Sequence, residues 1–164
     1  MIVIGIDPGL TGSLAMIGHR GVFEAIHDMP VMQRGGGKSF VKNQVNGSQL
    51  EELLSGWLAN EDKNAIHFFI ETPIAFPGQQ VAVTASTFLT AGLIEGVIQA
   101  RHYPHTLVRP QDWKKALGLT SNKEQARARA IRLYPEAAPL LSRVKDHNRA
   151  EALLIARYGW DVCA

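Results

Sequence analysis

The feature that most constrains the fold is a short apolar run at the start of the chain that ends in an acid. Residues 2–7 read IVIGID, and Asp7 is followed by Pro-Gly. A β-branched run of this length, closed by turn-forming residues, predicts a buried strand. Residues 66–71 (IHFFIE) repeat the pattern and end in Glu71. Because α/β sheets place ligands at the carboxyl ends of their strands, both acids are candidate functional residues.

The remaining pattern predicts an α/β fold. Runs at 11–18 and 22–28 indicate two more strands in an antiparallel meander with the first, and 105–110 indicates a last short strand. Meander strands followed by alternating helices and strands predict a five-stranded mixed sheet, three strands antiparallel and then two parallel, flanked by helices. Helices are expected from the S-x-x-E capping boxes at Ser48 and Ser121, and over 84–102, 111–118 and about 147–159.

Length and composition narrow the class of protein. The chain has 164 residues, 46% of them apolar, so residues 1–164 are expected to form one domain, too short for a two-domain kinase. No stretch looks like the ~20 apolar residues of a membrane span, and no secretion signal is evident. Cys163 is the only cysteine, so no intrachain disulfide forms. We therefore expect a cytoplasmic protein with no membrane and no small-molecule cofactor.

Charge is unevenly distributed along the chain. Residues 1–100 hold five Lys and Arg against nine Asp and Glu, whereas residues 101–164 hold 12 against six. Such asymmetry suggests a polyanion partner for the basic part, although a solvated helix surface gives the same pattern. Residues 29–47, with three consecutive glycines and several basic residues, are expected to form a long loop that is either functional or mobile.

The two strand-end acids predict a metal site if their strands are neighbours. Two close carboxylates repel unless a cation or a proton lies between them. Hard cations such as Mg²⁺ or Mn²⁺ prefer carboxylate oxygens. The alternatives are that Asp7 caps its own turn and that Glu71 is simply an exposed residue at a strand end.

A third group of candidates lies near the C-terminus. In a helix over 147–159, His147 and Glu151 share one face. This imidazole and acid are candidates to complete, with Asp7 and Glu71, a site for two cations. Asp146 stands where an N-cap residue would, and capping is its simplest role. For His147 the simpler alternative is an ordinary surface histidine.

Four segments together resemble the RuvC family of Holliday junction resolvases, and most closely its phage and prophage members. They are IVIGIDPGLTGSLA, FFIETPIAFPGQ, WKKALGL and DHNRAEALLIARYG, in order and at compatible spacing over nearly the whole chain. The resemblance implies an RNase H-like fold, a homodimer and a site with two divalent cations. It implies symmetric cleavage of four-way DNA, with hydrolysis of one phosphodiester by each protomer.

The resemblance also assigns roles by position. Asp7, Glu71 and Glu151 match the family's acids, but Asn148 stands where a further acid or histidine is expected. His147, and after it Asp146, are the candidates for the fourth ligand, and His147 is also a candidate for proton transfer. The expected DNA-contact residues are Lys114, Lys115, Lys123 and Arg127 on helices, with Ile74 and Phe76 as an apolar wedge that separates bases.

Other functions fit parts of the pattern. An RNase H-like nuclease for other branched nucleic acids has the same site, and a non-catalytic branched-DNA-binding protein would account for Asn148. The turn after Asp7 also resembles the first phosphate loop of actin- and hexokinase-like phosphotransferases, but that class repeats its fold in two domains, for which this chain is too short.

Overall fold

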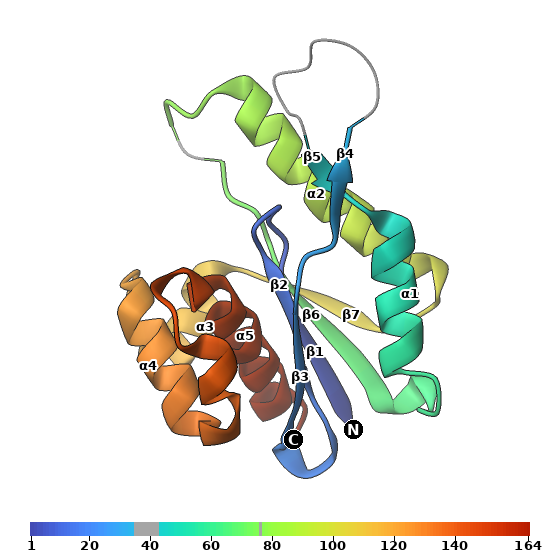
Figure 1. Ribbon diagram of the computed structural model, residues 1–164, viewed down its shortest axis with the longest axis vertical. Helices are drawn as coiled ribbons and strands as arrows, with labels where there is room; N and C mark the ends of the chain where they lie inside the picture. Colours follow the sequence, from blue (N-terminus) through green and yellow to red (C-terminus); the bar gives the residue numbers. More distant parts are fainter. Residues whose placement is uncertain (35–42, 76) are drawn as a thin grey trace.

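A five-stranded mixed sheet lies at the centre of the computed structural model, which describes residues 1–34, 43–75 and 77–164 (Figure 1). Its strand order is β3-β2-β1-β6-β7. The pairs β1–β2 and β2–β3 are antiparallel, and β1–β6 and β6–β7 are parallel, which confirms the predicted sheet. The strands are β1 Ile2–Asp7, β2 Ser13–Ile17, β3 Phe23–Asp28, β6 Ile66–Glu71 and β7 His105–Val108.

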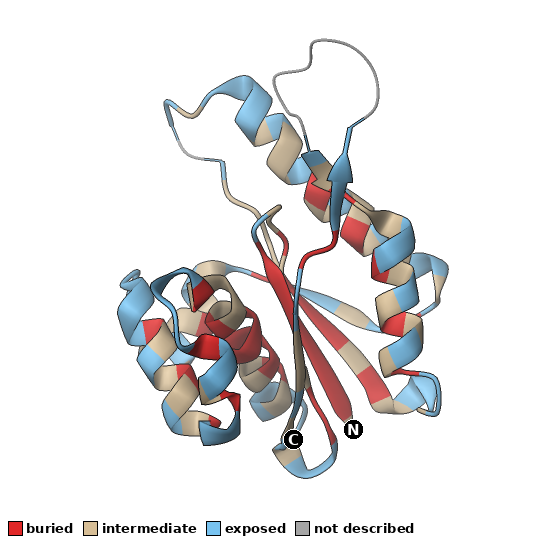
Figure 2. Ribbon diagram, in the orientation of Figure 1, coloured by how far each residue is buried: buried red, intermediate tan, exposed pale blue. Residues whose placement is uncertain are grey.

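Helices cover both faces of the sheet (Figure 1). On one face, α1 (Gly47–Trp57) and α2 (Val81–Ala100) pack on Ile4 and its neighbours. On the other face, α5 (His147–Cys163) packs on Val3 and Ala15. Buried residues therefore fill β1 and the inner side of α5 (Figure 2). The remaining helices are α3 Pro110–Ala116, α4 Lys123–Leu133, and the 3₁₀ turns η1 His19–Gly21, η2 Lys63–Ala65, η3 Pro135–Leu141 and η4 Val144–Asp146.

Two helix starts differ from the predicted capping boxes. The N-cap of α1 is Asn46, whose side chain accepts a hydrogen bond from the backbone N–H of Gln49. The N-cap of α4 is Asn122, which accepts from Glu124 and Gln125. The predictions at Ser48 and Ser121 were wrong because asparagine is as good an N-cap residue as serine and lies at the position where the extended backbone ends.

The segment 29–47 is not a continuous loop. Strands β4 (Val31–Gln33) and β5 (Asn43–Val45) pair antiparallel and form a separate two-stranded sheet. The expectation of a loop is therefore wrong for these two strands. Residues 35–42, which include two of the predicted basic residues, lie outside the described part of the chain.

Helix α2 departs from the expectation that no stretch is long and apolar enough for a membrane span. Among the described residues, α2 alone passes that test by length and composition, with 20 residues and a mean hydropathy of 1.7. Its C-terminal half packs on the core through Ile94 and Ile98, whereas Val81 and Leu89 in its N-terminal half are 84% and 54% exposed (Figure 2). One such helix is weak evidence for a membrane segment.

The close approach of α5 to β1 depends on Gly5. A Cβ atom at this position would lie 2.2 Å from the carbonyl oxygen of Ala152 and 2.2 Å from the backbone nitrogen of Ala156. Only glycine lets the helix backbone lie directly on the strand. Because Glu151 precedes Ala152, this contact sets the position of the Glu151 side chain relative to the end of β1.

Candidate active site

Two acids end neighbouring parallel strands, as predicted. Asp7 is the last residue of β1 and Glu71 the last residue of β6, and the register pairs Ile6 with Ile70 directly before them. The strand register therefore brings Asp7 and Glu71 to the same edge of the sheet. Both side chains are partly buried.

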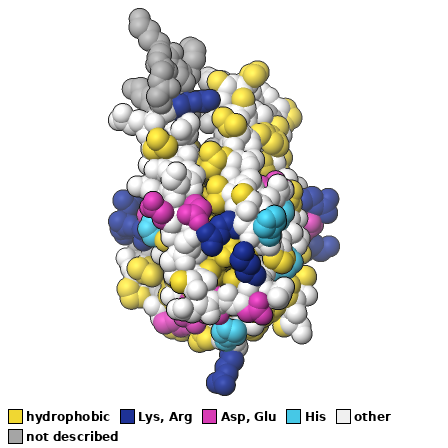
Figure 3. Space-filling model, turned by 90° about the vertical axis from the view of Figure 1, so that its right-hand side faces the viewer, with side chains coloured by type: hydrophobic (Ala, Val, Ile, Leu, Met, Phe, Trp, Pro, Cys, Tyr) yellow, Lys and Arg dark blue, Asp and Glu magenta, His cyan; other side chains and the backbone are white. Residues whose placement is uncertain are grey.

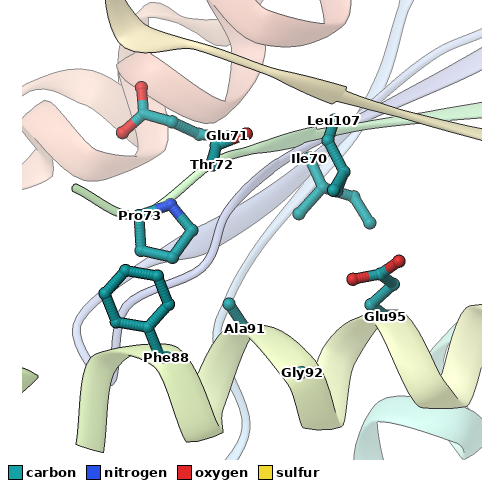
Figure 4. Close-up of a pocket in the computed structure, with 9 residues that line it drawn as sticks. All are labelled: Ile70, Glu71, Thr72, Pro73, Phe88, Ala91, Gly92, Glu95 and Leu107. Carbon is teal, nitrogen blue, oxygen red and sulfur yellow. The ribbon is translucent and has the colours of Figure 1, made fainter. Parts of the chain in front are cut away.

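Glu151 joins these two acids from α5. Its negative charge acts on both Asp7 and Glu71 and raises the pKa of each. The three carboxylates that the sequence nominated thus form one acidic cluster, at the place where the end of β1 meets the first turns of α5. Figure 4 shows the Glu71 carboxylate directed away from a hollow of about 230 Å³, which Phe88 and Glu95 line on α2.

Burial and mutual repulsion make this cluster electrostatically unfavourable. Burial is the largest cause of the raised pKa of Asp7, which reaches about 7 from an ordinary 3.8, and the charges of Glu71 and Glu151 add to it. Burial is also the main cause of the raised pKa of Glu71, opposed by a hydrogen bond from Trp113. A carboxylate whose ionised form is disfavoured by its surroundings is typical of a functional site, because a bound cation makes the ionised form favourable.

Two lysines lie beside the acids. Lys114 Nζ is 3.1 Å from Glu151 Oε1, and both side chains are largely covered. Lys114 and Lys123 act against the rise in the pKa of Asp7. Both residues were predicted as DNA contacts, and the structure places them at the acidic cluster. Positive charge here favours a phosphate next to the carboxylates.

The donor chemistry of the cluster fits a hard divalent cation. Asp7 and Glu71 end neighbouring strands and both resist ionisation, and the charge of Glu151 on α5 acts on both of them. Among the described residues, no three His, Cys, Asp or Glu side chains are arranged so that they could hold a metal ion as they stand. Asp7, Glu71 and Glu151 are the candidates to hold a cation, and water or a phosphate oxygen would have to complete its coordination.

The two candidates for a fourth ligand have different surroundings. Asp146 is 3% exposed, and its carboxylate accepts hydrogen bonds from the backbone N–H and the guanidinium of Arg143. These bonds lower its pKa. His147 is half-buried, and its Nε2 lies 2.8 Å from Nζ of Lys123. The imidazole therefore contacts a lysine that acts on Asp7. The Asp146 carboxylate is held by Arg143 at the start of η4, and it makes no capping hydrogen bond to α5, so the expected capping role there is wrong.

The nuclease activity that the resemblance implies should be at least about 10-fold lower in His147→Ala than in Asp146→Asn. The reason is that Asp146 is committed to Arg143, so that its replacement mainly costs stability. Single-turnover rates over a Mg²⁺ series measure the difference, with unfolding curves of both variants as the control. A larger rate loss in a fully folded Asp146→Asn would identify Asp146 as the ligand instead.

Asn148, the residue that departs from the family pattern, has a structural contact. Its side-chain amide donates to the carbonyl oxygen of Thr11 at 2.6 Å and to the Thr11 hydroxyl at 3.2 Å. It thereby fastens the turn after Asp7 to the first turn of α5. No sequence pattern indicated this contact, because the two residues are 137 positions apart.

The other predicted DNA-contact residues lie in different places. Ile74 and Lys115 line one hollow together with Lys114, beside the acidic cluster. Arg127 instead forms an ion pair with Glu124, and its guanidinium donates to the carbonyl oxygen of Leu141 at 2.8 Å. Phe76 lies outside the described residues.

Because its pKa is raised, Asp7 should lower the stability of the protein in EDTA at neutral pH. The folded state binds the Asp7 proton more tightly than the unfolded state, so the free energy of unfolding falls as pH rises from about 4 to about 7. Asp7→Asn removes this loss and should stabilise the protein by about 2 to 4 kcal/mol at pH 8, with little difference at pH 3.5. Urea unfolding at both pH values measures it. An equal gain at both would show that ionisation of Asp7 is not the cause.

Comparison with known proteins supports the fold and relates the sequence to one enzyme. No protein-family model matches the chain. A stretch of 101 residues, 60% of this chain, is 29% identical to the chloroplastic Holliday junction resolvase MOC1 of Chlamydomonas reinhardtii. The match spans 12% of that relative's length.

Two solved structures match over almost the whole chain. RuvC of Thermus thermophilus aligns with a TM-score of 0.56 at 16% identity, covering 99% of this chain and 97% of RuvC. The same protein in complex with a Holliday junction substrate aligns with a TM-score of 0.65 at 14% identity, covering 100% and 97%. The chain therefore has the fold of RuvC and is similar in sequence to a Holliday junction resolvase.

Proposed function

We propose that this protein is a metal-dependent endonuclease that resolves four-way DNA junctions. The observation that carries the proposal is the cluster of Asp7, Glu71 and Glu151 beside Lys114, in a chain with the RuvC fold. The sequence similarity to a Holliday junction resolvase supports the choice of substrate.

The proposed reaction is hydrolysis of a phosphodiester. Asp7, Glu71 and Glu151 would hold divalent cations such as Mg²⁺ or Mn²⁺, whose chemistry when bound would be to activate a water for attack on the phosphodiester and to stabilise the leaving 3′ oxygen. Asp7 feels the charges of both Glu71 and Glu151 and is the acid that would contribute most to holding a cation. Lys114 and Lys123 attract the phosphate to the cluster, and His147 accepts or returns a proton at Nε2.

The proposed DNA surface surrounds the acidic cluster. Lys115 and Lys123 are exposed, with Lys123 also in contact with His147, and Ile74 supplies an apolar surface close by. Phosphate contacts of this kind supply most of the affinity and make it fall with salt. The split between an acidic first part and a basic second part of the chain thus corresponds to a metal site next to a DNA surface.

We further propose that two copies act together. Symmetric resolution requires two nicks, and each chain supplies one acidic cluster. The exposed apolar side chains of α2, Val81, Val83, Phe88 and Leu89, are candidates for the contact between copies. Figure 3 shows hydrophobic side chains over the upper part of the molecule, where Figure 1 places α2. A solution mass of twice the chain, measured by light scattering, tests the dimer.

Cleavage of synthetic DNA tests the proposed function. A labelled four-way junction, a splayed duplex, a linear duplex and an RNA–DNA hybrid are each incubated with Mg²⁺, Mn²⁺ or EDTA. The proposal predicts cleavage of the four-way junction alone, with either metal and not with EDTA. The matched control Glu52→Gln changes an exposed acid on α1 and should cut like the wild type.

The competing functions give different results in the same experiment. Cleavage of the splayed duplex or the hybrid at an equal rate would indicate an RNase H-like nuclease of broader substrate range. Tight junction binding with no nicks at high Mn²⁺ would indicate a non-catalytic binder and would contradict the enzyme.

A further inference from the structure

Glu71 has a partner that the proposed chemistry does not use. The indole Nε1–H of Trp113 donates to Glu71 Oε2 at 2.6 Å, although the residues are 42 positions apart. Trp113 is fully buried on α3, in the same core cluster as Ala150 and Leu154 of α5. Packing therefore fixes the place of the ring, and the hydrogen bond fixes the Glu71 carboxylate against it.

The next residue of the same helix reaches a second acid. Lys114 Nζ lies 3.1 Å from Glu151 Oε1 and 4.9 Å from the centre of the Trp113 ring. Two consecutive residues of α3 thus contact two acids that come from β6 and α5. The indole N–H of Trp113 contacts Glu71, and the Lys114 ammonium lies over the indole ring. Trp113 therefore contacts both side chains.

We propose that Trp113 is a positioning residue that orients the Glu71 carboxylate toward a bound cation, while its ring holds the Lys114 ammonium beside Glu151. An indole N–H only donates and does not titrate, so it binds a carboxylate oxygen at any working pH without competing for a cation. A carboxylate accepts at about four lone-pair positions, so one indole bond leaves the others for a metal. Residues that hold metal ligands in this way are typically worth 10- to 100-fold in metal affinity or activity.

The sharpest test removes the N–H and keeps the shape of the side chain. Site-specific incorporation of benzothienylalanine at position 113 replaces the indole N–H by sulfur, and Trp113→Phe keeps a ring near Lys114 but also loses bulk. Trp160→Phe is the matched control, since Trp160 lies about 2.5 turns along α5 from Glu151 and packs near Gly21. The inference rests on the proposed function, so Mn²⁺ binding is measured by calorimetry without DNA, alongside Mg²⁺-dependent cleavage and melting temperature.

The sulfur isostere is expected to bind Mn²⁺ 10- to 100-fold more weakly than the wild type. The Mg²⁺ concentration for half-maximal cleavage should rise by a matching factor. The melting temperature should stay close to that of the wild type. Trp160→Phe should leave the metal readouts unchanged. Metal binding within twofold of the wild type in the isostere would overturn the role of Trp113, as would a lower melting temperature with unchanged metal affinity.

The two proposals fail in different ways. If the wild type binds Mn²⁺ but cuts no junction, the resolvase function is contradicted while the difference in Mn²⁺ affinity still decides the role of Trp113. If the wild type binds no Mn²⁺ at all, both proposals are wrong.

Discussion

Asp7→Asn is expected to slow cleavage of a four-way junction about 1,000-fold or more while junction binding is kept. The Asp7 carboxylate is acted on by the charges of both Glu71 and Glu151 and would hold a cation in the proposed site. A rate lower by about 1,000-fold corresponds to a loss of about 4 kcal/mol of transition-state stabilisation. Single-turnover cleavage at saturating enzyme measures the rate, and gel shift in EDTA measures binding.

Binding should be unchanged or tighter, because the substitution removes a negative charge that faces DNA phosphates. Glu52→Gln, the same kind of change on the exposed surface of α1, should leave both rate and binding as in the wild type. Cleavage by Asp7→Asn within 10-fold of the wild-type rate would mean that the acidic cluster is not the active site.

The second large effect is expected for Gly5→Ala. The added methyl group would meet the backbone of Ala152 and Ala156 at 2.2 Å, and two backbones cannot yield as a flexible side chain can. Overpacking of this kind costs about 3 kcal/mol, which in a chain of this size lowers the melting temperature by about 6 to 12 °C. Because α5 must shift away from β1, Glu151 leaves the cluster, and cleavage should fall even where the variant is folded.

Gly56→Ala is the matched control for this prediction. Gly56 lies in α1, and a Cβ atom there has nothing within 4 Å. Alanine at such a site should be neutral or stabilise by about 0.5 to 1 kcal/mol. Thermal and urea unfolding of both variants make the comparison. A Gly5→Ala protein as stable as Gly56→Ala would show that α5 does not depend on this contact.

The parts of the fold that the sequence predicted are those with a strong local pattern. Apolar runs that end in Asp7 and Glu71 identify strands, and short turns identify the meander. The errors lie where two neighbouring residues are equally good N-caps, or where a strand is too short to show an alternating pattern. Asn46 and Asn122 compete with the nearby serines as N-caps, and β4 and β5 are only three residues long, too short to show a period.

The sequence nominates the acids of the candidate site but not the contacts that surround them. Asp7, Glu71 and Glu151 follow strand ends or a helix face, which a sequence displays directly. The bonds from Trp113 to Glu71 and from Asn148 to Thr11 join residues 42 and 137 positions apart. Such contacts depend on how α3 and α5 pack on the sheet, and no spacing in the sequence encodes them. The two candidates for the fourth ligand, His147 and Asp146, differ in that Arg143 binds the Asp146 carboxylate, a contact that the sequence does not display.

The most direct measurement of the central claim uses a supercoiled plasmid that extrudes a cruciform, incubated with the wild-type protein and Mg²⁺. Coordinated nicks in two opposing strands convert this plasmid to a linear product, and mapping the ends should place the two nicks symmetrically across the junction. The same preparation of Asp7→Asn should leave the plasmid supercoiled. Nicked circles without linear product, or no cleavage by a wild-type protein that binds the cruciform, would contradict the resolution of four-way DNA by this chain.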